Sequence, residues 1–234
     1  IASDVPAILN HTREIIYLDD FEVMTLCRDG VTCTDIDGNV IEKEVHHIDW
    51  DASAAEKSGF PHFMLKEINE QPKVISDTLR GRFGASGEIL LDDMRLPEEK
   101  LKQVKKIMII SCGTAYHAGM VGKYLLEKFV RIPCEVDLAS EFRYRNPLVD
   151  DTTLVMTVTQ SGETADTLAG LREAHRRGSN VVSICNVVGS SIARESDGVI
   201  YQHAGPEIGV ASTKAYTSQV TCFVLFTLYL GRLR

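Results

Sequence analysis

The stretch TLVMTVTQSGETADTLAGLREAHRRG, residues 153–178, decides the fold. It begins with apolar and β-branched residues over the length of one strand, continues through small polar residues at 159–164, and ends in a helical pattern that stops at Gly178. A strand that is apolar throughout is typical of a sheet that helices cover on both faces. A buried strand that leads through a short turn into a helix is the repeating unit of an α/β fold.

The same unit recurs along the second half of the chain. Apolar runs of strand length alternate with helical patterns from residue 98 onward. This alternation predicts a doubly wound, five-stranded parallel sheet over residues 98–234, because crossover helices pack on both faces of such a sheet. The expected strands are 105–111, 133–140, 153–159, 180–186 and 198–203, and the expected helices are 115–130, 164–178, 190–196 and 212–230.

The first part of the chain has another character. Residues 1–50 contain short alternating segments with a turn at Asp37-Gly38-Asn39, which is a strong hairpin signal. Residues 51–97 are polar and broken, with helical pieces and three closely spaced glycines, and this pattern predicts an interdomain linker with no chemistry of its own. The chain does not begin with methionine and stops within a helical pattern, so we expect a piece of a longer protein.

Composition argues against several classes of function. The net charge of −8 leaves no basic stripe for nucleic acid, and no apolar run reaches the length of about 18 residues that a membrane span needs. Metal-ligand spacings and a Gly-x-Gly-x-x-Gly turn after the first strand are both missing, so we expect neither a metal nor a dinucleotide cofactor. The six cysteines are dispersed without a CxxC pair, which indicates a reducing compartment, the cytoplasm.

Three turns carry small and hydroxyl-bearing residues where a strand or loop leads into a helix, at 111–115, 159–164 and 209–214. In open parallel sheets, ligands bind beyond the carboxyl ends of the strands. Free N–H groups and the positive end of a helix dipole favour an anion there, while glycine allows close approach and Ser and Thr add donors. The sequence therefore predicts a small phosphate pocket that needs little positive charge.

Other interpretations of these turns are open. Ser and Thr are ordinary N-cap residues, so Thr164 could cap its helix and do nothing more. Cys112 could be a nucleophile, although a cysteine at the end of an apolar strand is more often structural. Ser161 lacks the leading glycine of a Gly-x-Ser-x-Gly hydrolase elbow. Lys214 could form a Schiff base or add positive charge beside an anion.

Five segments together resemble a known family: SCGTAYHAG, IPCEVDLASEFRYR, TQSGETADTLAGLR, ICNVVGSSIARESD and AGPEIGVASTKAYTSQ. In order and spacing they are similar to the first sugar-isomerase (SIS) domain of the isomerizing glutamine–fructose-6-phosphate aminotransferases. Residues 1–50 look like the end of that family's glutaminase domain, and KEINEQPKVI looks like part of its connecting segment. The resemblance implies a flavodoxin-like SIS domain over residues 98–234.

The resemblance also implies a binding site. In this family two SIS domains bind fructose 6-phosphate, and ammonia released from glutamine in another domain aminates it to glucosamine 6-phosphate. The family usually has serine where this chain has Ala115, which removes one hydroxyl donor, and serine where it has Thr159, which keeps the hydroxyl. The contacts to the sugar phosphate that the resemblance implies are Thr114, Ala115, Thr159, Gln160, Ser161, Thr164, Val210 and Ser212.

The same resemblance implies what this piece does alone. The family's glutaminase nucleophile, isomerase base and Schiff-base lysine have no counterpart in this chain, so we expect no catalysis by it. We expect it to bind fructose 6-phosphate or glucosamine 6-phosphate as a homodimer. Two alternatives stay open: a non-catalytic SIS module that senses phosphosugars, and a stand-alone phosphosugar isomerase. The strand-rich block at 1–50 argues against both, because neither class would carry it.

Overall fold

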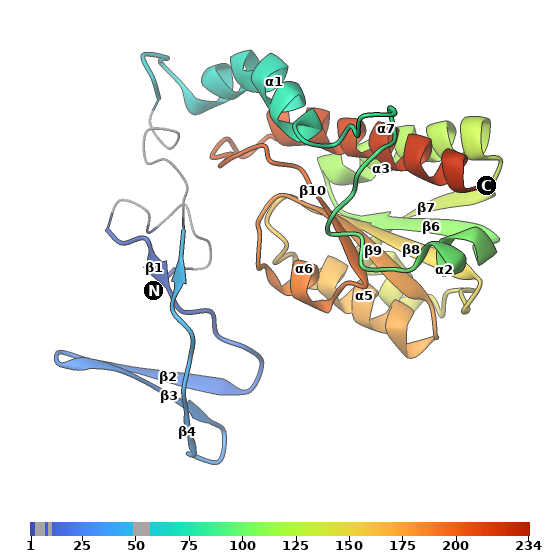
Figure 1. Ribbon diagram of the computed structural model, residues 1–234. Helices are drawn as coiled ribbons and strands as arrows, with labels where there is room; N and C mark the ends of the chain where they lie inside the picture. The colour runs from blue at the N-terminus through green and yellow to red at the C-terminus, as the bar shows by residue number, and fades with distance from the viewer. Residues whose placement is uncertain (3–7, 9–10, 49–56) are drawn as a thin grey trace. The chain divides into compact units, whose positions relative to one another are not determined.

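The computed structural model describes residues 1–2, 8, 11–48 and 57–234. Its contacts divide the chain into two compact units, Ile1–Glu56 and Lys57–Arg234. The boundary that the sequence predicted between residues 50 and 51 lies outside the described residues. Each unit contains β-sheet, and the helices with the largest sheet belong to the second unit (Figure 1).

The first unit contains two small antiparallel sheets, as the sequence predicted. Its strands are β1 (Glu14–Ile15), β2 (Glu22–Cys27), β3 (Gly30–Asp35), β4 (Val40–Ile41) and β5 (His46–His47). β1 pairs with β5, and β2, β3 and β4 form the other sheet. The Asp35 carboxylate fixes the turn between β3 and β4, because it accepts hydrogen bonds from the N–H groups of Asp37 and Asn39 at 2.9 and 2.8 Å.

The second unit is built on a five-stranded sheet whose strand pairs are all parallel (Figure 1). The strands are β6 (Lys106–Ser111), β7 (Cys134–Leu138), β8 (Thr153–Val158), β9 (Asn180–Cys185) and β10 (Gly198–Tyr201). They lie in the order β10-β9-β8-β6-β7, which is the flavodoxin-like order, and this confirms the predicted doubly wound sheet. The direction of the winding changes between β6 and β8, where folds of this class bind their ligands.

Helices cover both faces of this sheet (Figure 1). One face carries α3 (Thr114–Leu125), its π-helical extension η3 (Leu126–Val130) and α7 (Lys214–Leu233). The opposite face carries α4 (Ala139–Tyr144), α5 (Ala165–Arg176) and α6 (Ser191–Glu195). Two further helices, α1 (Phe63–Leu79) and α2 (Glu98–Gln103), pack against α7.

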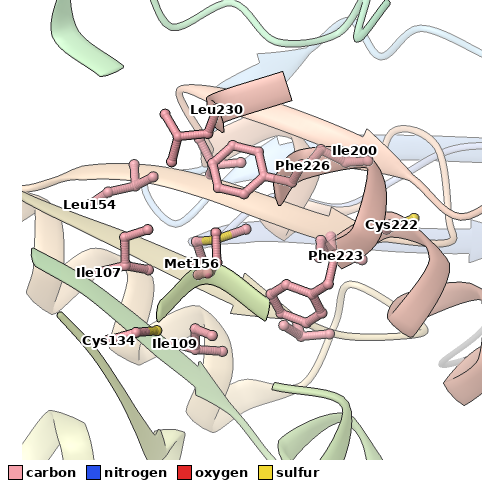
Figure 2. Packing of buried hydrophobic residues seen from close by; sticks show 14 of the residues in the cluster. Ile107, Ile109, Cys134, Leu154, Met156, Ile200, Cys222, Phe223, Phe226 and Leu230 are labelled. Carbon is pink, nitrogen blue, oxygen red and sulfur yellow. The ribbon is translucent and has the colours of Figure 1, made fainter. Parts of the chain in front are cut away.

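The core on the α3 and α7 side shows why these helices lie so close to the sheet (Figure 2). Ile107 and Met156 of the sheet and Phe223 and Phe226 of α7 belong to one cluster and are fully buried. Each such side chain stabilises the fold by about 1.5–3 kcal/mol. A Cβ at Gly122 of α3 would lie 2.4 Å from the Phe223 ring, so this glycine allows α3 and α7 to approach.

The segment 51–97, which the sequence predicted as a linker, packs closely where the structure describes it. α1 lies against α7, with Val74 and Thr78 buried. The Thr78 hydroxyl donates a hydrogen bond of 2.6 Å to the carbonyl of Gln202, at the end of β10. Leu96 joins the same hydrophobic core as the sheet. Residues 57–97 are therefore part of the second compact unit.

Four of the six cysteines are buried, Cys33, Cys134, Cys185 and Cys222, whereas Cys112 is half-buried and Cys27 is exposed. All six are free thiols. Burial raises the pKa of Cys134 and Cys222 to about 12 and that of Cys185 to about 11, so these three side chains stay uncharged near neutral pH. Among the described residues, no helix is both long and apolar enough to cross a membrane.

Candidate functional site

A cavity of about 390 Å³ lies where the winding of the sheet changes direction. The turns after β6 and β8 and the loop before α7 form its walls. Of the residues that the resemblance placed at the site, all but Ala115 line this cavity, whereas the Ala115 side chain packs in the hydrophobic core. The lining residues are Cys112, Gly113, Thr114, Val158, Thr159, Gln160, Ser161, Thr164, Thr167, Val210, Ala211 and Ser212.

The turn at residues 159–164 is fixed by its own hydroxyl groups. The buried Thr159 Oγ1 accepts a hydrogen bond from the N–H of Gly162 at 3.1 Å, and Ser161 Oγ accepts one from the N–H of Glu163 at 3.2 Å. The side-chain amide of Gln202 donates to the Thr159 carbonyl at 2.7 Å. Because both hydroxyl oxygens act as acceptors within the turn, their hydrogens can be donated to a ligand.

Gly162 is required by the geometry of this turn. Its φ of +75° is left-handed, and an added Cβ would lie 2.0 Å from Ser190 Oγ. The turn is also bound to α6, since the Gly162 carbonyl accepts from the N–H of Ile192 at 3.1 Å and the Glu163 carboxylate accepts from the N–H of Ser191 at 2.8 Å. The groups of this turn that line the cavity are therefore held in place by the protein itself.

Helix capping does not explain the hydroxyl groups at this site. Thr164 is the N-cap residue of α5, yet it makes no side-chain cap hydrogen bond. Its Oγ1 lies 3.4 Å from Thr159 Oγ1, which is a long contact. Gly113 is the N-cap residue of α3 and has no side chain that could cap. The first N–H groups of both helices lie beside the cavity, and such groups favour an anion.

Two further hydroxyl groups support the interpretation of the cavity as an anion site. Thr167 Oγ1 and Ser212 Oγ line the cavity and are buried, and neither has a hydrogen-bond partner among the described residues. A buried hydroxyl without a partner costs about 1–3 kcal/mol, which a ligand that accepts its proton would offset. Sequence reasoning missed Thr167, although it lies three residues after Thr164, a spacing that places both residues on the same side of α5.

The cavity carries no charged side chain among its lining residues. An anion would therefore be held by neutral N–H and O–H groups, as the acidic composition suggested. Lys214 does not line the cavity: it is 3% exposed, and its Nζ lies 2.6 Å from Glu70 Oε2. Cys112 does line it, but no histidine or carboxylate that could activate a thiol does so.

A metal centre would need a cluster of ligating side chains among the described residues. Among them, no group of three or more His, Cys, Asp or Glu side chains is arranged to hold a metal ion. The donors that line the cavity are hydroxyls, a carboxamide and backbone N–H groups. Such a set suits a phosphate better than a divalent cation, because its N–H and O–H groups can donate to anion oxygens and no carboxylate is present to balance a cation's charge.

Known proteins are similar in sequence to this chain over nearly its whole length. A glutamine–fructose-6-phosphate aminotransferase [isomerizing] of Clostridium tetani is 54% identical over 232 residues, and one of Thermus thermophilus is 50% identical over 235 residues. These matches cover 99% and 100% of this chain but 38% of each relative, so the chain spans well under half the length of these proteins.

Solved structures show the same relationship. The C-terminal domain of glucosamine-fructose-6-phosphate aminotransferase from Francisella tularensis is 48% identical, with a TM-score of 0.71 over 76% of this chain and 50% of that one. A glucosamine-6-phosphate deaminase from Thermotoga maritima, at 18% identity and a TM-score of 0.55, shares the fold alone. The family model of the SIS domain matches residues 100–229. The chain belongs to the SIS-domain family.

Proposed function

We propose that this chain is the sugar-phosphate-binding part of an isomerizing glutamine–fructose-6-phosphate aminotransferase. Such an enzyme makes glucosamine 6-phosphate from fructose 6-phosphate and glutamine. The observation that carries the proposal is the neutral cavity at the change of winding, with hydroxyl and N–H donors converging on it. Aminotransferases of this name are at least 50% identical to nearly the whole chain, the first 50 residues included, which supports the reaction.

In this proposal the 159–164 turn binds the phosphate. Ser161 and Thr159 donate their hydroxyl hydrogens, since their oxygens already accept backbone N–H groups. Thr114, Gln160 and Thr164 add donors from the walls of the cavity, and Val210 and Ser212 lie toward the sugar. A hydrogen bond to a charged group contributes about 1.5–3 kcal/mol, so several of them suffice without a lysine or arginine.

The cavity binds the substrate and leaves the proton transfers to other groups. The lining side chains include no histidine, carboxylate, lysine or arginine. A ketose amination needs a general acid–base residue near the operating pH, and this wall supplies none. The catalytic groups must therefore come from elsewhere in the assembled enzyme, and the chain alone is inactive.

Two other functions are less well supported. A non-catalytic phosphosugar sensor or a stand-alone phosphosugar isomerase would have no use for the strand-rich first unit, and the matches at 50% identity or more span that unit as well. The proposal includes a homodimer, as the family resemblance implies, and a cytoplasmic location, which the dispersed cysteines indicate. The six free thiols suit a reducing compartment.

The test is a titration of the 234-residue chain with fructose 6-phosphate, glucosamine 6-phosphate and fructose, followed by backbone amide chemical shifts. Both phosphosugars should shift the amides of residues 159–164, and fructose should leave them unchanged at the same concentration. An equal response to fructose, or shifts confined to the first 50 residues, would contradict the site.

A pair of variants that each introduce one negative charge sharpens this test. Gln160→Glu is nearly isosteric and places a negative charge in the neutral cavity, so the affinity for fructose 6-phosphate should fall by more than about tenfold. Gln103→Glu makes the same chemical change at an exposed position at the end of α2 and should leave the affinity unchanged. Equal losses in both variants would mean that net charge, rather than the cavity, governs binding.

A further inference from the structure

The loop between β10 and α7, residues 202–213, brings Val210, Ala211 and Ser212 to the cavity, and its support comes from an unexpected element. Glu67 of α1 is 2% exposed. Its Oε1 accepts hydrogen bonds from the N–H groups of Ile208 at 2.7 Å and Gly209 at 3.1 Å, and its Oε2 lies 3.2 Å from the same Gly209 nitrogen. One buried carboxylate thus holds the base of the loop.

The close approach depends on Gly209. A Cβ at this position would lie 2.5 Å from Glu67 Oε2, so any side chain would push the loop and the carboxylate apart. The next residue, Val210, lies at the rim of the cavity and is fully exposed. The neighbouring anchor is Glu207, whose Oε1 accepts from the N–H of Thr213 at 2.8 Å and so fixes the start of α7.

Other contacts of α1 and α7 lie close to Glu67 in the sequence of α1. Glu70 pairs with Lys214 at 2.6 Å and with Lys66 at 3.4 Å, and Thr217 donates to Gln71 at 2.6 Å. The contacts of Glu70 with Lys214 and of Gln71 with Thr217 join α1 to α7, and the Glu70–Lys66 pair lies within α1. Glu67 instead contacts the backbone of the loop itself. Removing Glu67 should therefore free the loop with the two helices still joined.

We infer that Glu67 is a positioning residue that fixes the sugar-facing wall of the cavity through Ile208 and Gly209. The inference rests on the proposed function and extends it, since it divides the site into two parts. The 159–164 turn binds phosphate without help from α1, while the wall at 210–212 contacts the sugar only when Glu67 holds the loop. Glu67 does not line the cavity, so it acts through the loop.

The experiment compares Glu67→Gln with the unchanged chain, using fructose 6-phosphate and inorganic phosphate as probes. The amide of glutamine has one acceptor instead of two and no charge, so the dissociation constant for fructose 6-phosphate should rise about tenfold. The constant for inorganic phosphate should stay within about twofold. Amide hydrogen exchange at Ile208 and Gly209 should become faster in the variant, because their common acceptor is weakened.

Two further variants guard the result. Gly209→Ala leaves the Glu67 charge in place and displaces the loop by steric contact, so it should reproduce the pattern even if Glu67→Gln fails to fold. Asp77→Asn removes another carboxylate from α1. Among the described residues, Asp77 forms ion pairs only with Lys73 and Arg80, which lie about one helical turn away on either side, so the dissociation constants for fructose 6-phosphate and phosphate should not change.

Several outcomes would overturn the inference. A parallel rise in both dissociation constants would show that Glu67 supports the fold as a whole. Unchanged exchange at Ile208 and Gly209 would show that the loop keeps its place without the carboxylate. If the unchanged chain binds phosphate but does not distinguish fructose 6-phosphate from it, the proposed function fails, and the exchange measurement alone then decides whether Glu67 anchors the loop.

Discussion

The two walls of the cavity are built differently, although both present small residues to the ligand. The 159–164 turn follows the central strand β8 and is held by its own hydroxyls, by Gln202 and by α6. The 210–212 wall lies at the exposed end of a loop, where Val210 is open to solvent and a carboxylate from α1 holds the loop behind it. Hydroxyls within its own segment help to fix the first wall, whereas the second wall is fixed at its base by a carboxylate from another helix.

This difference suits the two ends of a sugar phosphate. A phosphate group is compact and has the same shape in every ligand, so a preformed turn with fixed donors binds it at little cost in ordering. In the proposed function the sugar end must enter and leave, and the exposed end of the loop at Val210 can move while the 159–164 turn stays in place. We expect changes in the first wall to affect folding and binding together, and changes in the second to affect binding alone.

The largest effect should come from Gly162→Ala. A Cβ there meets the Ser190 hydroxyl at 2.0 Å and the residue has a φ of +75°, so overpacking and backbone strain act together. The free energy of unfolding should fall by about 3 kcal/mol or more, and phosphosugar binding should be lost. Urea unfolding and the titration measure the two effects.

Gly178→Ala is the matched control for this change. Gly178 ends α5 with a φ of +88°, and nothing lies within 4 Å of an added Cβ. The substitution should therefore cost only the backbone strain, about 1 kcal/mol, with binding intact. If both alanine variants lose the same stability, the Ser190 contact is not what fixes the turn, and the first wall is less rigid than the structure implies.

The rigid wall could be predicted from the sequence because its parts are local. Strand, turn and helix all lie within residues 153–178, and the apolar run followed by small polar residues marks each part. The support of the second wall could not be predicted in this way. The contact between Glu67 and Ile208 joins residues 141 positions apart, and Glu67 lies in a segment whose glycines and polar residues resemble a linker.

A smaller effect is expected from Thr164→Ala, and it separates ligand binding from helix capping. If Thr164 stabilised α5 as an N-cap, its loss would cost about 0.5–2 kcal/mol. The structure shows no cap hydrogen bond from its side chain, so the free energy of unfolding should change by less than about 0.5 kcal/mol. The affinity for fructose 6-phosphate should fall about tenfold, because a donor to the phosphate is lost.

Thr25→Ala serves as the control for Thr164→Ala. Thr25 is an exposed threonine on β2 in the first unit, and it should change neither stability nor affinity. A stability loss near 1 kcal/mol for Thr164→Ala with unchanged affinity would reverse the assignment. The hydroxyl would then belong to the fold, and the first wall would hold the phosphate by its backbone N–H groups alone.

Much of the fold was accessible from sequence, and the exceptions have physical causes. The five apolar strands and their helices were predicted because burial on both faces removes alternation. The packing of α1 was missed because its buried positions include Lys66, Glu67 and Thr78, which look solvated in sequence and are buried here through ion pairs and hydrogen bonds. Ala115 was placed at the site by resemblance, whereas its methyl group packs in the core.

The smallest expected effect concerns the far end of α5 and tests whether the first wall is independent of it. His175 Nε2 lies 3.1 Å from Asp197 Oδ2, and this hydrogen bond raises the pKa of His175 although burial opposes it. A raised folded-state pKa stabilises the protein below the unfolded value, near 6.5, and that contribution is lost as pH rises through the folded value. Since the pair is about one third exposed, we expect only a few tenths of a kcal/mol.

The measurement is the difference in unfolding free energy between the unchanged chain and His175→Gln, from pH 6 to pH 9. The difference should shrink as pH rises, and Asp197→Asn should abolish the same pH dependence, because the charged acceptor of His175 is then replaced by a neutral amide. Fructose 6-phosphate affinity should be equal in the unchanged chain and His175→Gln at each pH, since α5 separates His175 from Thr164 by about 17 Å. An affinity that follows the ionisation of His175 would show that the 159–164 wall responds to a distant charge. The contrast between this wall and the 210–212 wall would then fail.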